Sequence, residues 1–238
     1  AKRLGRPIKL VPTRDQGFTI TTHRAETRHE IKLGANRDGK LLALRHEGAE
    51  VSSRADAYCV GGTKTTTRLY ACPNVDSLVS IVRADRNTPG FMRSPPEVPY
   101  LFALESAMDE LAVKLNIDPV ELRRINDTNV EPIGGKPYTS RSLMACFDEA
   151  AKAFGWAQRS PQPKSMADGD WLVGYGCAAT CYPTQLGPSA ARVRLQRDGR
   201  TRIAIAGHDI GTGAYTVIAQ TAAEALRVRP RRRRGGRV

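Results

Sequence analysis

The chain has 238 residues, of which 40% are hydrophobic and 26% charged, a globular composition that excludes wholesale disorder. No run of about 18 apolar residues occurs, so the sequence predicts no membrane-spanning helix. The net charge is +13, but residues 227–238 carry seven arginines and no acid, and the remainder has 30 basic against 24 acidic residues. The composition typical of nucleic-acid binding is therefore confined to this C-terminal segment.

Strands are predicted in two parts of the chain. Residues 7–11 form a short apolar run that predicts a strand. Within 31–44, apolar residues lie on both sides of the turn-forming residues 36–39, which predicts a hairpin. A second hairpin is predicted over 192–205 around the turn 197–199, because apolar residues there alternate with arginines.

Two helices are predicted in the middle of the chain. Apolar residues recur at three- and four-residue spacing from Pro99 to Leu115, which predicts a helix with one buried stripe. A second helix is expected from Pro119 to Ile125, with Asp118 accepting a hydrogen bond from the amide of Glu121 and the Glu121 side chain reaching back.

Two further helices complete the predicted elements. One runs from about Ser142 to Phe154 and ends at Gly155, and the other follows Gly213. The first is expected to bury Leu143, Phe147, Ala150 and Phe154. Strands and helices occur in blocks without a regular βαβ alternation, so the predicted class is α+β, with hairpins and mixed sheets flanked by helices.

A stiff loop over residues 87–97 holds Phe91, Met92 and Arg93 between prolines and a glycine. Such a loop can fix an arginine in a pocket, where its guanidinium offers paired donors to an anion. A surface loop with a solvated arginine fits the same spacing, so both interpretations stay open at this point.

A glycine-rich segment over residues 207–213 leaves an apolar strand and opens a helix. The free amides and positive dipole of the first helical turn suit a phosphate or another anion. Asp209 and Thr212 could equally cap the helix. Neither the five cysteines nor the four histidines show a metal-ligand spacing, so no metal site built from side chains is predicted.

Several separated blocks carry a resemblance to a known family: residues 5–14, 87–97, 102–112, 117–126 and 209–220. In this order and spacing they resemble the molybdenum-binding subunit of the xanthine dehydrogenase/aldehyde oxidase family, in its bacterial aldehyde-dehydrogenase branch. The match covers about residues 1–226.

The resemblance implies a molybdenum–molybdopterin cytosine dinucleotide cofactor, which hydroxylates an aldehyde or an N-heterocycle with water-derived oxygen. It also implies electron transfer to an iron–sulfur subunit and an FAD subunit, with no role for a membrane. Residues 1–135 would belong to the first molybdopterin-binding domain and 136–226 to the start of the second. The expected location is the cytoplasm, with the periplasm as the alternative.

The resemblance also assigns site residues by position. Arg93 matches the loop arginine beside the molybdenum, and Gly211, Thr212 and Gly213 match the loop that touches the pterin or its pyrophosphate. The implied residues are Arg93 as the catalytic residue, Phe91, Arg93, Asp209, Gly211, Thr212 and Gly213 as cofactor-binding residues, and Thr180 and Tyr182 in the substrate pocket.

The chain departs from the family pattern in two ways. The Gly-x-Phe-Gly loop and the later Gly-x-Gly-Glu segment, whose Glu is the catalytic base, are absent, so an internal fragment that is inactive alone is expected. After Leu226 only Arg, Pro, Gly and two Val occur, which is typical of GC-rich DNA read in a shifted frame. Residues 227–238 are therefore interpreted as an out-of-frame tail. The alternatives are a basic tail that binds nucleic acid or another polyanion, and a nonfunctional truncated product.

Overall fold

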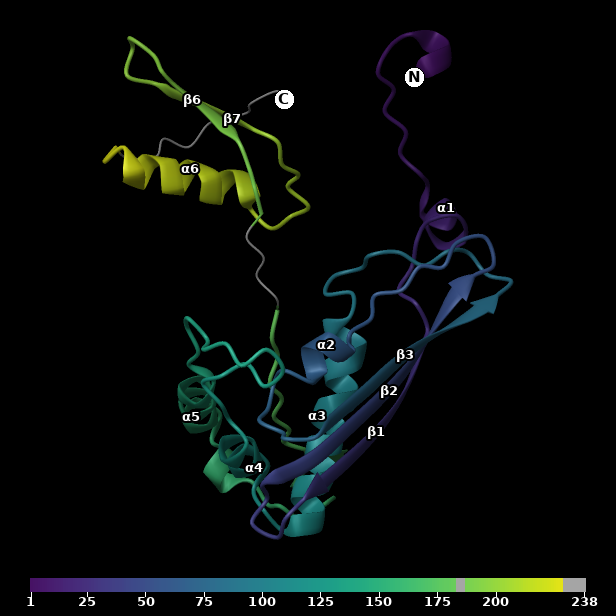
Figure 1. Ribbon diagram of the computed structural model, residues 1–238, viewed down its shortest axis with the longest axis vertical. Coiled ribbons are helices and arrows are strands. Elements are labelled where there is room, and N and C mark those ends of the chain that lie inside the picture. The colour runs from purple at the N-terminus through teal and green to yellow at the C-terminus, as the bar shows by residue number, and fades with distance from the viewer. Residues whose placement is uncertain (183–186, 229–238) are drawn as a thin grey trace. The chain divides into compact units, whose positions relative to one another are not determined.

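The computed structural model describes residues 1–182 and 187–228. The chain folds into two compact units, Ala1–Pro183 and Thr184–Val238. Helices and small sheets occur together in both units (Figure 1), so the predicted α+β class is confirmed. None of the helices in the described part of the chain has the length and apolarity needed to cross a bilayer.

The main sheet of the first unit has the strand order β1-β2-β3, with β1 at Thr27–Ala35, β2 at Leu41–Ser53 and β3 at Val75–Ala84. Strands β1 and β2 are antiparallel, which confirms the first predicted hairpin and lengthens it. Gly39 makes the turn possible because its φ of 86° is one that side chains rarely allow. Strand β3 pairs in parallel with β2 and was not predicted, because its apolar residues do not alternate.

The strand predicted at residues 7–11 is wrong. No strand forms there, and Leu10 and Val11 are 87% and 70% exposed, because no neighbouring strand pairs with this segment. The N-terminal segment instead contains a 3-10 turn, η1 (Lys2–Leu4), and a short helix, α1 (Arg14–Thr19). Thr13 and Gln16 cap α1 by exchanging side-chain and backbone hydrogen bonds.

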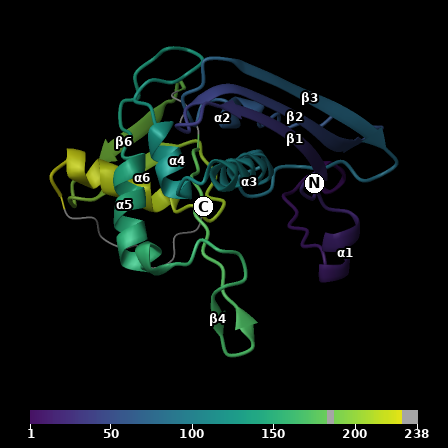
Figure 2. The same cartoon turned by 90° about the horizontal axis from the view of Figure 1, so that it is seen from below.

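Helix α3 (Glu97–Leu115) lies along one face of the sheet, as Figures 1 and 2 show. Of its predicted apolar stripe, Leu101, Leu104 and Met108 are buried, whereas Leu111 and Leu115 are half-buried. Tyr100 and Ala112 are buried as well. The helix begins two residues before the predicted start, since Pro99 fits in the first turn, where its missing N–H costs no hydrogen bond. Gly48 of β2 lets α3 approach closely, because a Cβ there would meet the Tyr100 hydroxyl at 2.8 Å.

The helix predicted after Asp118 is confirmed as α4 (Pro119–Ile125). The Asp118 carboxylate accepts hydrogen bonds from the amides of Val120 (2.8 Å) and Glu121 (3.2 Å). The Glu121 side chain does not reach back as predicted, because it pairs with Arg124 one turn later at 3.1 Å.

Helix α5 (Leu143–Phe154) ends at Gly155, whose φ of 76° confirms the predicted stop. Its predicted burial is wrong in part. Phe147 is buried and Leu143 half-buried, but Ala150 is exposed and Phe154 is 62% exposed. The smaller elements of this unit are α2 (Thr63–Thr66), η2 (Trp156–Gln158), β4 (Ala167–Asp168) and β5 (Trp171–Leu172).

The second unit contains the hairpin β6 (Ala191–Leu195) and β7 (Thr201–Ile205), which confirms the second predicted hairpin. Helix α6 (Ala214–Ala225) follows Gly213, as predicted. Among the described residues of this unit only Ala223 is buried. Most of the predicted arginine tail, residues 229–238, lies outside the described residues.

A fully buried ion pair connects α3 to α4. Arg123 Nε donates to Glu105 Oε2 at 2.8 Å, and both side chains are at most 5% exposed. The same carboxylate accepts from the Tyr70 hydroxyl at 2.8 Å and from the amide of Ala179 at 2.7 Å. A buried charge needs such a complete set of donors, because removal from water is otherwise costly.

Replacing Glu105 is therefore expected to destabilise the first unit strongly. Glu105→Ala removes the buried carboxylate that pairs with Arg123 and leaves Asp109, 42% exposed and 2.9 Å away, as the remaining acidic partner, so the loss of unfolding free energy is at most about 3–5 kcal/mol. Urea denaturation of the purified variant measures this loss. The control is Asp85→Ala, which removes an exposed partner of Arg54 and should leave the free energy nearly unchanged. Equal effects of the two substitutions would contradict the prediction.

A second buried polar contact joins the sheet to α2. The Thr66 hydroxyl donates to the Thr63 carbonyl at 3.1 Å, so it accepts from His46 Nδ1 at 2.9 Å. His46 Nε2, 3.1 Å from His29 Nδ1, is then the acceptor of that contact. A second proton, on His46 Nε2, would point at the His29 N–H, so the charged form of His46 is disfavoured. Burial, and secondarily the His29 charge, lowers the pKa of His46 to about 4.

This lowered pKa predicts a loss of stability in mild acid. The unfolded histidine takes up a proton near its ordinary pKa of 6.5, whereas the folded one resists until about 4. The stabilisation is thus complete above pH 6.5, and about 2 kcal/mol of it is lost between pH 7 and pH 5. Urea titrations at the two pH values test this. His46→Gln should remove most of the dependence, whereas His208→Gln, at an exposed position, should retain it.

Candidate functional site

The loop that carries Arg93 connects β3 to α3 and is fixed at several points. The Thr88 hydroxyl lies 2.7 Å from the Ser53 hydroxyl at the end of β2. The amide of Gly90 donates to the carbonyl of His23 at 3.0 Å. Gly90 is needed there, because a Cβ at this position would lie 2.6 Å from the Cβ of Thr22. The segment before β1 and the Arg93 loop thus run in close contact.

The Arg24 side chain binds the backbone of the same loop. Its guanidinium donates to the carbonyls of Arg93 (2.6 Å), Ser94 (3.0 Å) and Pro95 (3.1 Å). Ser94 has a φ of 51°, in the left-handed region. The amides of residues 91–94 have no backbone hydrogen-bond partner within the described residues. Successive free amides near a left-handed residue are typical of a concave anion site.

Two of the residues assigned by resemblance lie at the surface of this loop. The Arg93 side chain is exposed and makes no ion pair within the described residues. The Phe91 ring is 78% exposed and lies edge-on to Tyr58, with ring centroids 5.5 Å apart. The Tyr58 hydroxyl is buried without a hydrogen-bond partner in the described residues, and burial raises its pKa. Both Phe91 and Arg93 are therefore accessible to a ligand.

A groove of about 480 Å³ begins at this loop and follows α3. It lies between α3 and the segment 176–180, and both Thr180 and Ser94 are among its lining residues. Glu97, 5% exposed, lines it, and its Oε2 atom has no hydrogen-bond partner in the described residues. Tyr182 is 69% exposed and is not among the lining residues. The structure thus places Thr180 in the groove that begins at the Arg93 loop but does not place Tyr182 there.

The segment that contains Asp209 and Gly211–Gly213 belongs to the second unit. The Asp209 carboxylate accepts from the amides of Gly211 (2.9 Å) and Gly213 (3.2 Å). These backbone bonds lower the pKa of Asp209. The helix start therefore binds an oxyanion, and in this structure the anion is its own aspartate. Thr212 is exposed beside it.

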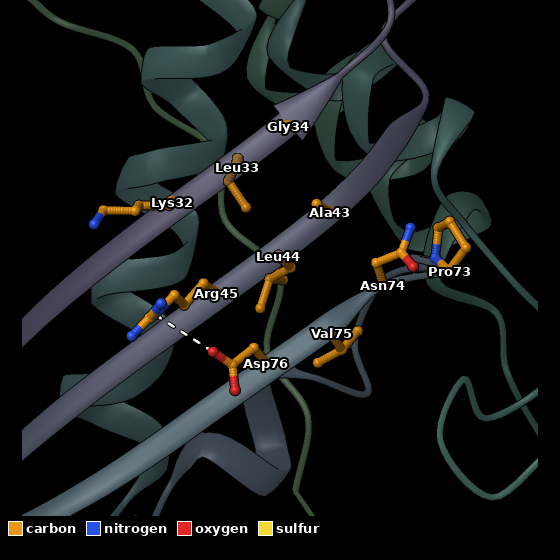
Figure 3. Close-up of a pocket in the computed structure, with 10 residues that line it drawn as sticks. All are labelled: Lys32, Leu33, Gly34, Ala43, Leu44, Arg45, Pro73, Asn74, Val75 and Asp76. Atoms are coloured by element: carbon orange, nitrogen blue, oxygen red, sulfur yellow. Dashed lines mark ion pairs between the residues drawn. The ribbon is translucent and has the colours of Figure 1, made fainter.

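A second hollow, of about 530 Å³, lies on the main sheet and is lined by none of the residues of the Arg93 loop (Figure 3). Lys32, Arg45 and Asp76 occupy matching positions on the three strands, and Arg45 pairs with Asp76 at 3.4 Å. Both members of this pair are largely exposed. The hollow holds no buried polar group without a partner within the described residues, so the Arg93 loop and the α3 groove are the better candidate site.

Sequence reasoning missed Arg24, Tyr58 and Glu97. Arg24 stands alone in a polar stretch, and its carbonyl partners lie about 70 residues further along the chain. Glu97 is the first residue of α3, where an acidic side chain is ordinary and carries no signal of its own. Only the tertiary structure brings these residues to one site.

The comparisons with known proteins place the chain in a family of molybdopterin-binding proteins. Two sequence profiles described as molybdopterin cofactor-binding domains match residues 1–127 and 149–232, and the chain belongs to this family. The fold is similar to that of quinoline 2-oxidoreductase from Pseudomonas putida 86, with a TM-score of 0.72 and 19% identity over 94% of this chain and 32% of that one. Aldehyde oxidoreductase from Desulfovibrio gigas gives a TM-score of 0.67 and 24% identity over 89% of this chain and 24% of that one.

Two relatives of similar sequence are named as molybdenum-binding subunits. The aldehyde oxidoreductase molybdenum-binding subunit PaoC of Escherichia coli K12 is 40% identical over 96% of this chain. The xanthine dehydrogenase molybdenum-binding subunit of Escherichia coli O157:H7 is 30% identical over 94%. The chain spans 31% of the length of each of these relatives. The family resemblance read from the sequence is thereby confirmed.

The close contact at Gly90 gives a prediction about the loop. Gly90→Ala places a methyl group against Thr22 and should separate the loop from the segment before β1, at a cost of about 1–3 kcal/mol. Urea denaturation measures the loss. Gly174→Ala is the matched control, because a Cβ there meets nothing within 4 Å. Equal unfolding free energies of the two variants would contradict the close contact between Gly90 and Thr22.

Proposed function

We propose that this chain is part of the molybdenum-binding subunit of a molybdenum hydroxylase that oxidises aldehydes or N-heterocycles. The 40% identity to an aldehyde oxidoreductase subunit favours an aldehyde substrate. Iron–sulfur and FAD subunits are the proposed electron acceptors, and the cytoplasm is the proposed location. We further propose that residues 1–135 belong to the first cofactor-binding domain and 136–226 to the second.

One observation carries the proposal: the free amides of residues 91–94 beside the exposed Arg93. Molybdopterin bears phosphate, and its metal centre is surrounded by anionic oxygen and sulfur. A row of N–H donors next to a guanidinium fits such a group, since charge-assisted hydrogen bonds are the strong ones. Phe91 extends this surface with an exposed apolar ring. The residues present therefore fit the cofactor that the family binds.

Other residues of the chain have supporting roles in this proposal. The Asp209 carboxylate organises the loop in which Gly211, Thr212 and Gly213 lie, and this loop would contact the pterin or its pyrophosphate. Thr180 would line the substrate pocket from the groove, and Tyr182 would contribute from beyond it. The cytosine dinucleotide is the proposed form of the cofactor.

When bound, the cofactor supplies the transfer of water-derived oxygen and accepts two electrons. Arg93 would hold the anionic centre and keep the reacting groups in a fixed geometry. No carboxylate in this sequence matches the family's motif for the catalytic base. We therefore propose that the chain is inactive by itself. Its contribution to activity has to be measured in the longer subunit that contains this segment.

In that subunit, assembled with its partners, Arg93→Ala should lower aldehyde-dependent dye reduction by on the order of 10²-fold, because the reacting groups lose a positioning contact. Molybdenum content, measured by elemental analysis, should fall or stay unchanged, which separates a binding role from a purely catalytic one. The thermal midpoint should not move, since the Arg93 side chain is exposed.

The matched control is Arg54→Ala, which removes another exposed arginine of the same unit. It should leave molybdenum content and turnover at the wild-type level. Wild-type turnover and metal content in Arg93→Ala would refute the proposed site and favour a plain surface loop.

A further inference from the structure

The strongest unexplained feature near the site is the arrangement of Arg24. One guanidinium donates hydrogen bonds to the carbonyls of three consecutive residues, 93–95, at 2.6–3.1 Å. The side chain is half-buried and makes no ion pair within the described residues. An arginine used only as a surface charge does not need three backbone acceptors from one loop.

We propose that Arg24 is a positioning residue for the Arg93 loop. It draws the carbonyls of residues 93–95 to one side, which leaves the amides of 91–94 available to an anionic group. The identity of that group as molybdopterin rests on the proposed function. The positioning itself does not, because it follows from hydrogen bonds within the chain.

The loop needs such support for two reasons. Pro95 and Pro96 have no N–H, so this part of the backbone cannot be held by donating its own hydrogen bonds. Ser94 has a φ of 51°, a conformation that a non-glycine residue keeps only when its surroundings enforce it. Arg24 supplies the donors that the prolines cannot. Its hydrogen bonds reach the carbonyl of Ser94 and those of the residues before and after it.

The chemistry of arginine suits this role better than that of lysine. The guanidinium is planar and presents several N–H groups in a fixed fork, so it can bind adjacent carbonyls at once. Since Arg24 has no carboxylate partner in the described residues, its positive charge is not cancelled. The charge therefore adds to the positive field that the free amides present to an anion.

The test uses the longer subunit, purified with its cofactor, and two variants, Arg24→Lys and Arg24→Gln. In hydrogen–deuterium exchange of peptides covering residues 87–97, the amide of Gly90, which donates to the His23 carbonyl, should exchange about tenfold faster, which corresponds to the loss of roughly one net hydrogen bond. Peptides from β2 should exchange as in the wild type and report an intact fold. Arg54→Lys is the control, since Arg54 is exposed and pairs with Asp85 outside this loop.

The functional readouts are molybdenum content and the separate values of kcat and KM. Both variants should lower molybdenum content and reduce kcat more than they change KM, with Arg24→Lys the milder. Unchanged exchange at residues 87–97 in Arg24→Lys would overturn the proposal even if Arg24→Gln fails to fold. Faster exchange with wild-type molybdenum content and kcat would also overturn it. If either of these results is found and Arg93→Ala still loses activity, the proposed function is retained and only the role of Arg24 is refuted.

Discussion

The carboxylate of Glu105 has to be satisfied completely, because it is 4% exposed and ionised groups are costly to bury. Its donors come from three places in the chain: Tyr70 after α2, Arg123 on α4, and the amide of Ala179. Each of these segments can therefore take only one position against α3. The first unit is organised around this single helix, with the sheet on one face (Figure 2) and the Glu105 donors on another.

This constraint also creates the candidate site. The amide of Ala179 is held on Glu105, so the segment 176–180 runs beside α3 and the groove opens between them. The Arg93 loop enters α3 at Glu97 and is fixed from the other side by Arg24 and by the contact at Gly90. A fixed helix and a clamped loop together hold a row of amides in place without a ligand, which is what preorganised binding requires.

The proline-rich loop before α3 and the glycine-rich loop before α6, which the sequence both singled out, behave differently. The loop before α3 turns its carbonyls inward and leaves amides free, so it is open to an external anion. The loop before α6 turns its amides onto Asp209 and satisfies them internally. The difference decides what each loop can bind, since only an amide that no acceptor in the chain satisfies is available to an external anion. In the proposed function, the free amides of the first loop bind the molybdopterin cofactor of the family to which the chain belongs.

The sequence by itself determined the elements whose signals are local. Asp118 before Pro119 marked the start of α4, Gly155 marked the end of α5, and alternating residues around turns marked both hairpins. It also determined the family, because separated motifs kept their order. Tertiary structure alone decided that residues 7–11 stay unpaired, that β3 joins β2 in parallel, and that Phe154 remains exposed. It alone placed Arg24 against the Arg93 loop. In each of these cases the outcome depends on a partner, present or missing, that lies far away in the sequence and that no local pattern reveals.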